Sequence, residues 1–315
     1  MRYNNILFAA AAIVLLAASV SAQTTGMAGA FNRIGFGARG IGMGNALSAV
    51  RTGENSSFYN PAALAQLKET YTSVSYSVMT LDRQMNTLAI GMPLDTNAGL
   101  GFGILNTGVK NIDGRDNEGL KTGALSVSEN KFFLSFAMRV RKLTFGITTN
   151  FFYYSLYEKL SSTSLGIDFG AMLPLSSRLT VAVVFKDINA KYRWDTGELY
   201  GQSGNTTMDR FPLRKTLGAS FLLPEVNGLL SAEYEATNAR TSLFRAGMEV
   251  TPIEALTLRG GIDEYSTTHS DQAHPSFGFT LRTDVSGWHP AFHYAYMLEP
   301  YGLSAIHVLS LSVKL

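Results

Sequence analysis

Apolar and polar side chains alternate with a period of two residues over most of the chain, from about residue 70 to the end. The segments TSVSYSV at 72–78 and SFGFTLR at 276–282 both place apolar residues at every second position. Because successive side chains of an extended strand point to opposite faces, this rhythm predicts β-strands that each carry one apolar face. The chain is therefore expected to fold mainly as β-sheet.

The alternating segments are fourteen in number, and most of them are about nine to eleven residues long, the length that lets a tilted strand cross a bilayer. An even number of strands is what a single-chain bacterial membrane barrel contains. The segments begin near residues 70, 84, 97, 129, 143, 162, 179, 213, 227, 242, 256, 274, 290 and 303.

The connections between these segments differ in length according to their position in the series. Those after even-numbered segments are short, as at 93–96 and 141–142, whereas the three longest follow odd-numbered segments at about 106–128, 189–211 and 265–273. Membrane barrels have short turns at one end and longer loops at the other, whereas a soluble sandwich has no reason to sort its loops in this way.

Composition and the first residues indicate export to a membrane. Charged residues make up 16% of the 315 residues, the chain has no cysteine, and its formal net charge of +2 gives no reason to expect a nucleic-acid partner. Arg2, an apolar run and the small residues Val20-Ser21-Ala22 predict a secretory signal peptide over 1–22. No later segment is a run of eighteen apolar residues, so the combined pattern predicts an outer-membrane β-barrel.

The glycines near the start of the mature chain, Gly35-x-Gly37-x-x-Gly40, have the spacing of a dinucleotide-binding turn. That turn needs a buried strand before it, a helix after it and an acidic residue in the next strand. Here a polar, glycine-rich stretch precedes the glycines, and no such acidic residue follows them. The glycines therefore serve another purpose.

The same region resembles a known family, the PorV/PorQ family of outer-membrane proteins, which are FadL-like barrels. Two elements carry the resemblance: Gly37-Ala38-Arg39 with Gly42-Met43-Gly44, and Phe58-Tyr59-Asn60-Pro61-Ala62. Further likeness, in segments such as IDGRDNEG and VVFKDINAKYRWDT, extends it over nearly all of the mature chain. The resemblance implies a fourteen-stranded barrel at 70–315 and a hatch formed by 23–69 inside it.

The physical properties of 23–69 fit a hatch as well. Its small residues allow close packing against a barrel wall, Pro61 suits the start of a helical turn, and Asn60 is suited to bonding local backbone. The alternative is a disordered periplasmic tail, which the apolar content opposes. The residues expected to form the hatch motif are Gly37, Arg39, Gly42, Gly44, Asn60, Pro61 and Ala62.

If the apolar phase of the strands faces lipid, the other phase lines the lumen, and it carries charges of both signs. A Lys or Arg facing lipid at the bilayer midplane costs about 2–4 kcal/mol, which favours the inward position. These side chains are expected to form a structural ladder of arginines and carboxylates, with a polar path or an anion site as the alternative. The predicted lumen wall consists of Asp168, Arg214, Glu233, Glu235, Arg245, Glu249, Arg259 and Arg282.

Signals for catalysis or metal binding are weak. His269, Asp271 and His274 supply too few ligands for a metal site, and the acidic residues of 113–118 lack the spacing of a calcium loop. No nucleophile and base are spaced for catalysis, so we expect neither an enzyme nor a cofactor.

Three functions remain open at this point. The resemblance to PorV/PorQ implies an accessory role in protein secretion of the type IX kind or in cell-surface attachment, with secretion or surface-attachment proteins as partners. The FadL-like resemblance implies uptake of hydrophobic small molecules. The third alternative is a structural barrel without transport. Outer-membrane lipid is an expected partner in all three.

Overall fold

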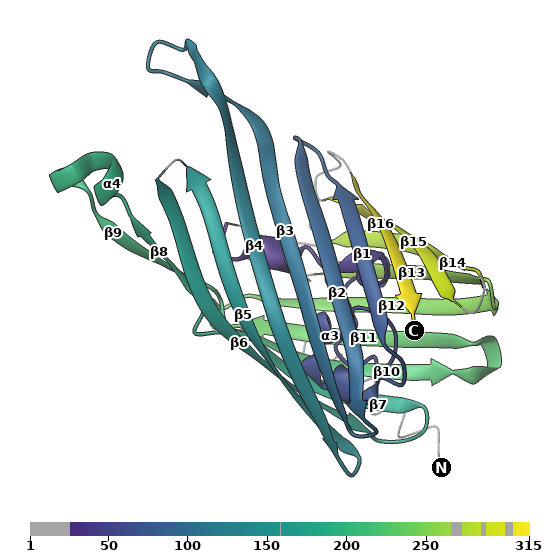
Figure 1. Ribbon diagram of the computed structural model, residues 1–315. Coiled ribbons are helices and arrows are strands. Elements are labelled where there is room, and N and C mark those ends of the chain that lie inside the picture. The colour runs from purple at the N-terminus through teal and green to yellow at the C-terminus, as the bar shows by residue number, and fades with distance from the viewer. Residues whose placement is uncertain (1–25, 158, 266–272, 285–287, 300–304) are drawn as a thin grey trace.

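The computed structural model describes residues 26–157, 159–265, 273–284, 288–299 and 305–315. Within these residues, fourteen antiparallel strands form a closed barrel, in which β1 pairs with both β2 and β16 (Figure 1). The predicted fourteen-stranded antiparallel barrel is thereby confirmed. The predicted signal peptide, 1–22, lies outside the described residues.

The strands follow one another around the barrel in chain order, except that β10 pairs directly with β7 because β8 and β9 form a separate hairpin. The barrel strands are β1 (Tyr71–Val78), β2 (Arg83–Asp95), β3 (Ala98–Arg115), β4 (Lys121–Val140), β5 (Leu143–Tyr157), β6 (Leu160–Pro174), β7 (Leu179–Ile188), β10 (Arg214–Leu223), β11 (Gly228–Thr237), β12 (Ser242–Ile253), β13 (Leu256–Tyr265), β14 (His274–Arg282), β15 (His289–Leu298) and β16 (Ala305–Lys314).

Two of the long connections expected from the sequence have more structure than predicted. The expected loop at 106–128 is wrong, because β3 and β4 continue through most of it as a paired hairpin that projects beyond the barrel (Figure 1). The connection at 189–211 contains the hairpin of β8 (Lys191–Asp195) and β9 (Thr206–Arg210), with the short helices α4 (Gly197–Tyr200) and η3 (Gly201–Ser203) at its tip. The third, 265–273, lies almost entirely outside the described residues. Pro224–Val226 forms the one-turn helix η4 between β10 and β11.

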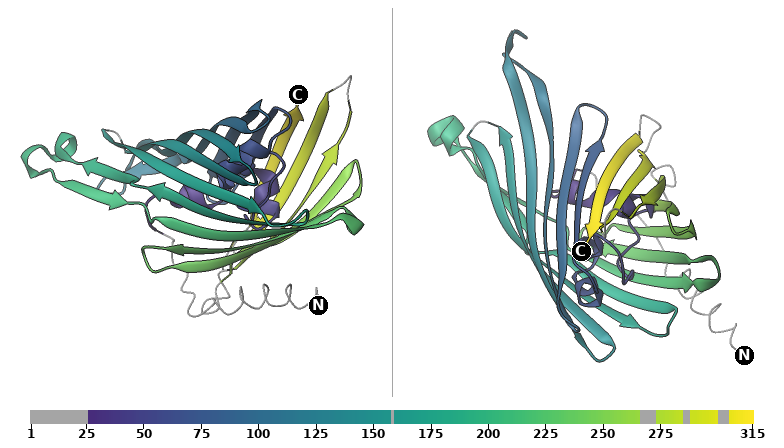
Figure 2. Two further views of the ribbon diagram at one scale, coloured as in Figure 1. Left: turned by 90° about the horizontal axis from the view of Figure 1, so that it is seen from below. Right: turned by 45° about the vertical axis from the view of Figure 1, so that its right-hand side comes forward.

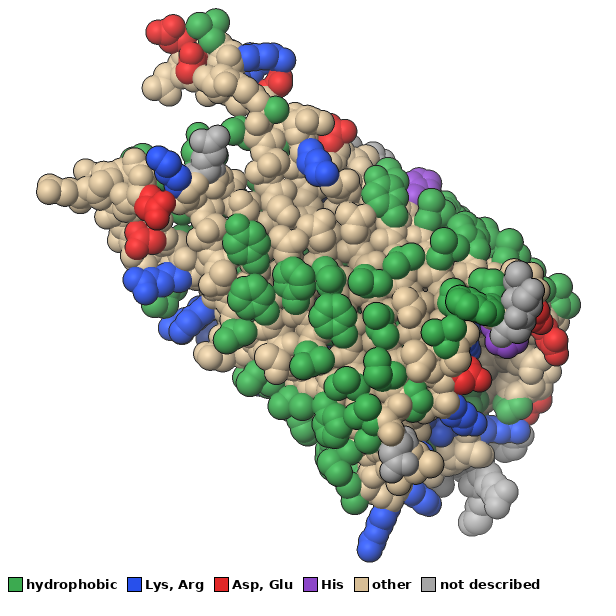
Figure 3. Space-filling model, viewed as in Figure 1, with side chains coloured by type: hydrophobic (Ala, Val, Ile, Leu, Met, Phe, Trp, Pro, Cys, Tyr) green, Lys and Arg blue, Asp and Glu red, His purple; other side chains and the backbone are tan. Residues whose placement is uncertain are grey.

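The outer surface of the barrel is apolar, as the two-residue rhythm predicts. On β1, Val74, Tyr76 and Val78 are 45–48% exposed, whereas the intervening Ser73, Ser75 and Ser77 are buried. Hydrophobic side chains gather over the strand surfaces in the view of Figure 3, and charged ones lie mainly towards the ends and on the projecting hairpins. This arrangement is typical of a barrel whose outer face meets hydrocarbon.

A leucine in this apolar surface tests the membrane contact. Leu134 on β4 is 55% exposed and pairs with Phe102 and Thr149 on the neighbouring strands, whereas Leu120, 63% exposed, lies in the turn of the projecting hairpin. We expect Leu134→Arg to destabilise the barrel by about 2–4 kcal/mol, because it places a cation in hydrocarbon. Folding titrations into lipid vesicles measure this, and Leu120→Arg serves as the control without effect.

The N-terminal segment, residues 30–67, contains four short helices and packs against the inner faces of barrel strands (Figures 1 and 2). Most of its residues are buried. Among the described residues, no helix has the length and apolar character needed to cross a bilayer. The four helices are η1 (Ala30–Arg33), α2 (Gly37–Gly42), α3 (Ser56–Tyr59) and η2 (Pro61–Gln66).

Candidate functional site between the N-terminal segment and the barrel wall

Helix η2 packs against β3, β4, β5 and β6, and its start has the local structure that the sequence predicts. Asn60 is its N-cap, and the side-chain oxygen of Asn60 accepts a hydrogen bond of 2.9 Å from the Ala62 nitrogen. Pro61 occupies the first helical position, where no N–H is needed. The other end of the Asn60 amide donates to the Ser48 carbonyl at 2.7 Å, so one side chain joins two parts of the segment.

Backbone meets backbone where the segment approaches β13. Gly44 has φ +58°, a conformation that favours glycine, and a Cβ at this position would overlap the main chain of Ile262. A Cβ on Gly261 would in turn overlap the main chain of Met43 and Gly44. Because both sides of this contact are glycines, the main chain of the segment packs directly against the main chain of the wall.

Arg39 on α2 joins the segment to β12 through a charged contact. Its guanidinium donates to both carboxylate oxygens of Glu249 at 3.0 and 3.1 Å and to the Thr52 carbonyl at 2.6 Å. Arg259, directly across from Glu249 in the sheet, binds the same carboxylate at 2.6 Å. Burial acts to lower the pKa of Arg39, but the charges of Glu249 and Glu54 outweigh it and raise that pKa, so Arg39 remains a cation.

Two β-bulges turn aspartates of the wall towards the segment. The register between β6 and β7 shifts beside Asp187, and that between β12 and β13 shifts beside Asp263. Each aspartate is buried and accepts a hydrogen bond from an asparagine of the segment: Asn32 binds Asp187 at 3.1 Å, and Asn45 binds Asp263 at 2.6 Å. A bulge re-aims a side chain at the point where the ladder is interrupted, and here it provides a docking point.

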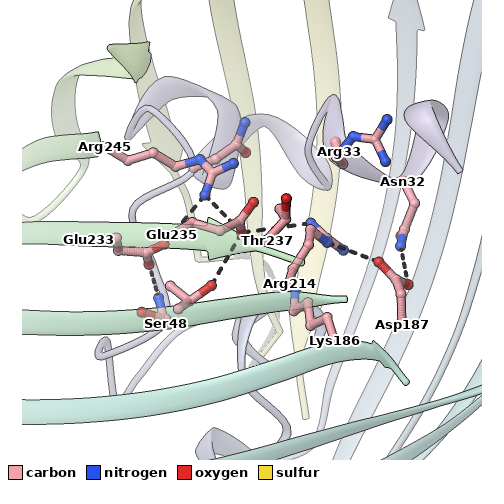
Figure 4. Close-up of polar contacts among 12 residues, drawn as sticks. Asn32, Arg33, Ser48, Lys186, Asp187, Arg214, Glu233, Glu235, Thr237 and Arg245 are labelled. Atoms are coloured by element: carbon pink, nitrogen blue, oxygen red, sulfur yellow. Dashed lines mark hydrogen bonds and ion pairs between the residues drawn. The ribbon is translucent and has the colours of Figure 1, made fainter. Parts of the chain in front are cut away.

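A polar cluster on β7, β10, β11 and β12 lies between these two docking points (Figure 4). Arg214 binds Asp187 at 2.9 Å, and Arg245 bridges Glu235 at 3.2 Å and Asp263 at 2.5 Å. Glu233 accepts a hydrogen bond from the backbone nitrogen of Ser48, which belongs to the N-terminal segment. Buried charges are tolerated because each has partners of opposite charge or hydrogen-bond donors.

The opposite side of the lumen, along β4 and β5, is aromatic. Phe36 and Phe58 of the N-terminal segment stack at 4.6 Å and contact Phe133 of β4, and this group belongs to one continuous buried cluster that extends to Phe152 and Phe211. The cluster continues towards the projecting β8–β9 hairpin, where the rings that lie in contact are those of Tyr154, Tyr192 and Trp194.

A buried lysine lies at the middle of this aromatic track. The Lys131 ammonium is 4.8 Å from the centre of the Phe58 ring and 5.7 Å from those of Phe133 and Phe152. It also donates to the Asn32 amide oxygen at 3.1 Å and faces Asp168 at 3.8 Å. Lys131 thus joins the aromatic and the charged sides of the lumen.

The structure places the predicted hatch-motif residues at the contact between segment and wall. Gly37, Arg39 and Gly42 lie on α2, Gly44 faces β13, and Asn60, Pro61 and Ala62 begin η2 beside β5 and β6. All seven are buried.

Most residues of the predicted lumen wall form ion pairs. Arg214, Glu233, Glu235 and Arg245 are linked by ion pairs, Glu249 and Arg259 form a separate pair, and Asp168 faces Lys131. Arg282 differs, because it is exposed near the end of β14 and binds Thr257 at 2.7 Å without joining the cluster.

Sequence reasoning missed several members of the site. Lys131 shares the inward phase of β4 with Phe133 and Ser135, so strand phase contained a usable signal for it. Asp187 was not assigned to the lumen, because the bulge breaks the alternation on which that assignment depends. Asn32 and Glu54 lie in the N-terminal segment, which has no alternation of apolar and polar residues to indicate which side chains face the wall.

The weak metal candidates gain no support. His269 and Asp271 lie outside the described residues, whereas His274 begins β14. Among the residues that the structure describes, no group of three or more His, Asp or Glu side chains is placed to hold a metal ion. Asp113 instead pairs with Lys121 at 3.0 Å across the β3–β4 hairpin, where both side chains are exposed.

Glu54 makes the contact between segment and wall sensitive to acid. Burial acts to raise its pKa, but the charges of His293 in its protonated form, Arg39 and Arg259 outweigh this and lower the pKa from 4.5 to about 2. Because the folded-state pKa is depressed, this stabilisation is present above about pH 4.5 and is lost as the pH falls towards 2. We expect the protection of α2 amides against hydrogen exchange, relative to unprotected amides at the same pH, to fall over that range, and Glu54→Gln to reduce the acid dependence; an unchanged profile in this variant would contradict the assignment.

Comparison with known proteins gives matches in structure only, since no protein-family model and no curated sequence matches the chain. The toluene transporter TodX of Pseudomonas putida superposes with a TM-score of 0.61 at 14% identity, covering 89% of this chain and 97% of that one. The toluene transporter TbuX of Ralstonia pickettii superposes with a TM-score of 0.62 at 13% identity, covering 90% of this chain and 98% of that one. A FadL homologue of Pseudomonas aeruginosa superposes with a TM-score of 0.58 at 13% identity, covering 89% of this chain and 99% of that one. At these identities the likeness shows a shared fold: the chain is a FadL-like fourteen-stranded β-barrel.

Proposed function

We propose that the chain is an outer-membrane channel for hydrophobic small molecules, with the N-terminal segment as its hatch. The observation that carries this proposal is the aromatic track along β4 and β5, a buried cluster that includes Phe58 of the segment and against which the partly buried Tyr154 and Trp194 pack. An apolar track inside a barrel suits a ligand that leaves water, whereas a polar solute needs a hydrated lining. Solved structures of the same fold described as toluene transporters support it.

The apolar outer surface and the sequence-predicted signal peptide support the outer membrane as the location. The hatch role is supported by the charged and backbone contacts between the N-terminal segment and the wall, Arg39 with Glu249 and Gly44 with Gly261 among them. Phe36 and Phe58 also pack against Phe133 of the wall, so moving the segment would expose these aromatic rings as well as break the polar contacts.

Neighbouring phenylalanines on β5 provide the test. Phe152 is fully buried in the track, and Phe151 is 41% exposed on the outer face. We expect Phe152→Asn to reduce uptake of labelled toluene several-fold in cells that carry the protein, because it interrupts the track. Phe151→Asn, with a similar loss of apolar surface, should leave uptake close to the unmodified level. Equal uptake in the unmodified protein and in cells lacking it would contradict the proposal.

A secretion or surface-attachment role of the PorV/PorQ kind is the second candidate. One feature favours it: the β3–β4 and β8–β9 hairpins project beyond the barrel and carry exposed Leu120, Tyr200 and Met208 (Figure 1). Removing the tip of the β3–β4 hairpin would abolish capture of a secretion partner and leave toluene uptake unchanged. If the unmodified protein captures no secretion partner and takes up toluene, transport alone is supported.

A further inference from the structure

A small polar cavity lies between the N-terminal segment and the charged wall. Its volume is about 30 Å³, and its lining includes Ser48 of the segment together with Arg214, Glu233, Glu235 and Arg245 of the wall. These residues belong to the polar cluster of Figure 4, in which Ser48 is bonded to Glu233 and Arg245 to Glu235. A cavity of this volume has room for an ordered water molecule.

Three buried side-chain atoms around this cavity have no hydrogen-bond partner among the described residues: Ser48 Oγ, Arg214 Nη2 and Glu235 Oε1. Arg214 uses its Nε for Asp187, and its Nη1 is 4.0 Å from Glu235 Oε2, too far for a hydrogen bond. Glu235 uses Oε2 for Thr216 and Arg245. A buried polar atom left without a partner costs about 1–3 kcal/mol, more if it is charged, so the three together call for a common partner.

The chemistry of the three atoms selects that partner. Arg214 Nη2 only donates, Glu235 Oε1 only accepts, and the Ser48 hydroxyl does either. A chloride ion would meet the carboxylates of Glu233 and Glu235, and a sodium ion would meet the guanidiniums of Arg214 and Arg245. Water accepts from Arg214, donates to Glu235 and forms a third bond with Ser48, the usual number for a buried water.

We propose that one tightly bound water molecule bridges Ser48, Arg214 and Glu235 and forms part of the interface between the N-terminal segment and the wall. The site connects a residue of the segment to residues of two wall strands, so it completes the contact that Glu233 makes with the Ser48 nitrogen. The proposal does not depend on what the channel transports.

A high-resolution crystal structure of the complete protein tests the site directly. We expect one density peak within hydrogen-bond distance of all three atoms. A dry cavity in which Arg214 Nη2 and Glu235 Oε1 bind protein atoms would overturn the proposal. A bromide soak provides the second arm: an anomalous peak at this position would show an anion and would equally overturn it.

Matched serine variants identify the partner on the segment. Ser48→Ala removes one of the three bonds, and we expect the peak to weaken or move towards Arg214 and Glu235. Ser220→Ala is the control, because Ser220 also joins wall and segment, through a 2.8 Å bond to the Ala49 carbonyl. The peak should be unchanged in the Ser220→Ala protein; an unchanged peak in Ser48→Ala would show that Ser48 does not bind the water.

Discussion

Gly261→Ala should dislodge the N-terminal segment from the wall, although it adds a single methyl group. The new Cβ would overlap the main chain of Met43 and Gly44. A flexible side chain could move aside by changing its rotamer, but these main-chain atoms cannot. Overpacking of this kind costs about 1–3 kcal/mol in well-packed interiors. We expect trypsin to cleave at Arg33 and Arg39 in the folded barrel of this variant and not in the unmodified protein, with a parallel rise in ion conductance across planar bilayers.

The adjacent glycine supplies the control. A Cβ on Gly260 would have Ser276 O, at 4.0 Å, as its nearest heavy neighbour, because this position points away from the segment. Gly260→Ala should therefore keep the segment protected and the conductance low. If both variants behave alike, the close approach of Gly44 to β13 is not what holds the segment.

Arg39→Met should have the largest effect on stability among substitutions in the segment. It removes the bidentate contact with Glu249 and the bond to the Thr52 carbonyl, and it leaves Glu249, whose side chain is 15% exposed, with Arg259 as its remaining cation. Breaking a buried ion pair costs about 3–5 kcal/mol where the other charge is left without a partner. Because Arg259 still binds Glu249, we expect a loss at the lower end of that range. Urea-induced release of the segment, followed by hydrogen exchange in α2, measures the loss.

Arg178→Met is the matched control for Arg39→Met. Arg178 pairs with Glu225 at 2.8 Å, but both side chains are about half exposed, so water screens the interaction. We expect no measurable change in segment release. A comparable loss in the two variants would mean that Arg39 acts through overall charge rather than through its buried contact.

The barrel was predictable because lipid and lumen impose opposite demands on successive residues of each strand. The strands predicted to begin at 143, 179, 242, 256 and 274 begin at those positions. The alternation of apolar and polar residues ends where both faces of a strand meet water. For this reason the extensions of β3 to Arg115 and of β4 back to Lys121 were expected to be loop. Pairing there depends on the hairpin itself and leaves no two-residue pattern of polarity.

The candidate site was predictable in part for the same reason. Strand phase indicated that Glu233, Arg245 and their neighbours point inward, and the structure links them through ion pairs. Their partners in the N-terminal segment, Asn32 and Asn45, were not predictable, because contacts between segments distant in the chain depend on the closed barrel. Asp187 owes its position to a bulge that alternation does not reveal.

A designed disulfide tests most directly whether the N-terminal segment occupies the lumen. The chain has no cysteine, and a Cβ placed on Gly42 lies 3.6 Å from the Cβ of Ala295 on β15, within the range of about 3.5–4.5 Å that a disulfide requires. The Gly42→Cys/Ala295→Cys protein should form an intramolecular disulfide in folded, membrane-inserted barrels, whereas Gly42→Cys combined with Ala219→Cys on the outer face should not. Free thiols in the first pair, in barrels that have otherwise folded normally, would contradict the account.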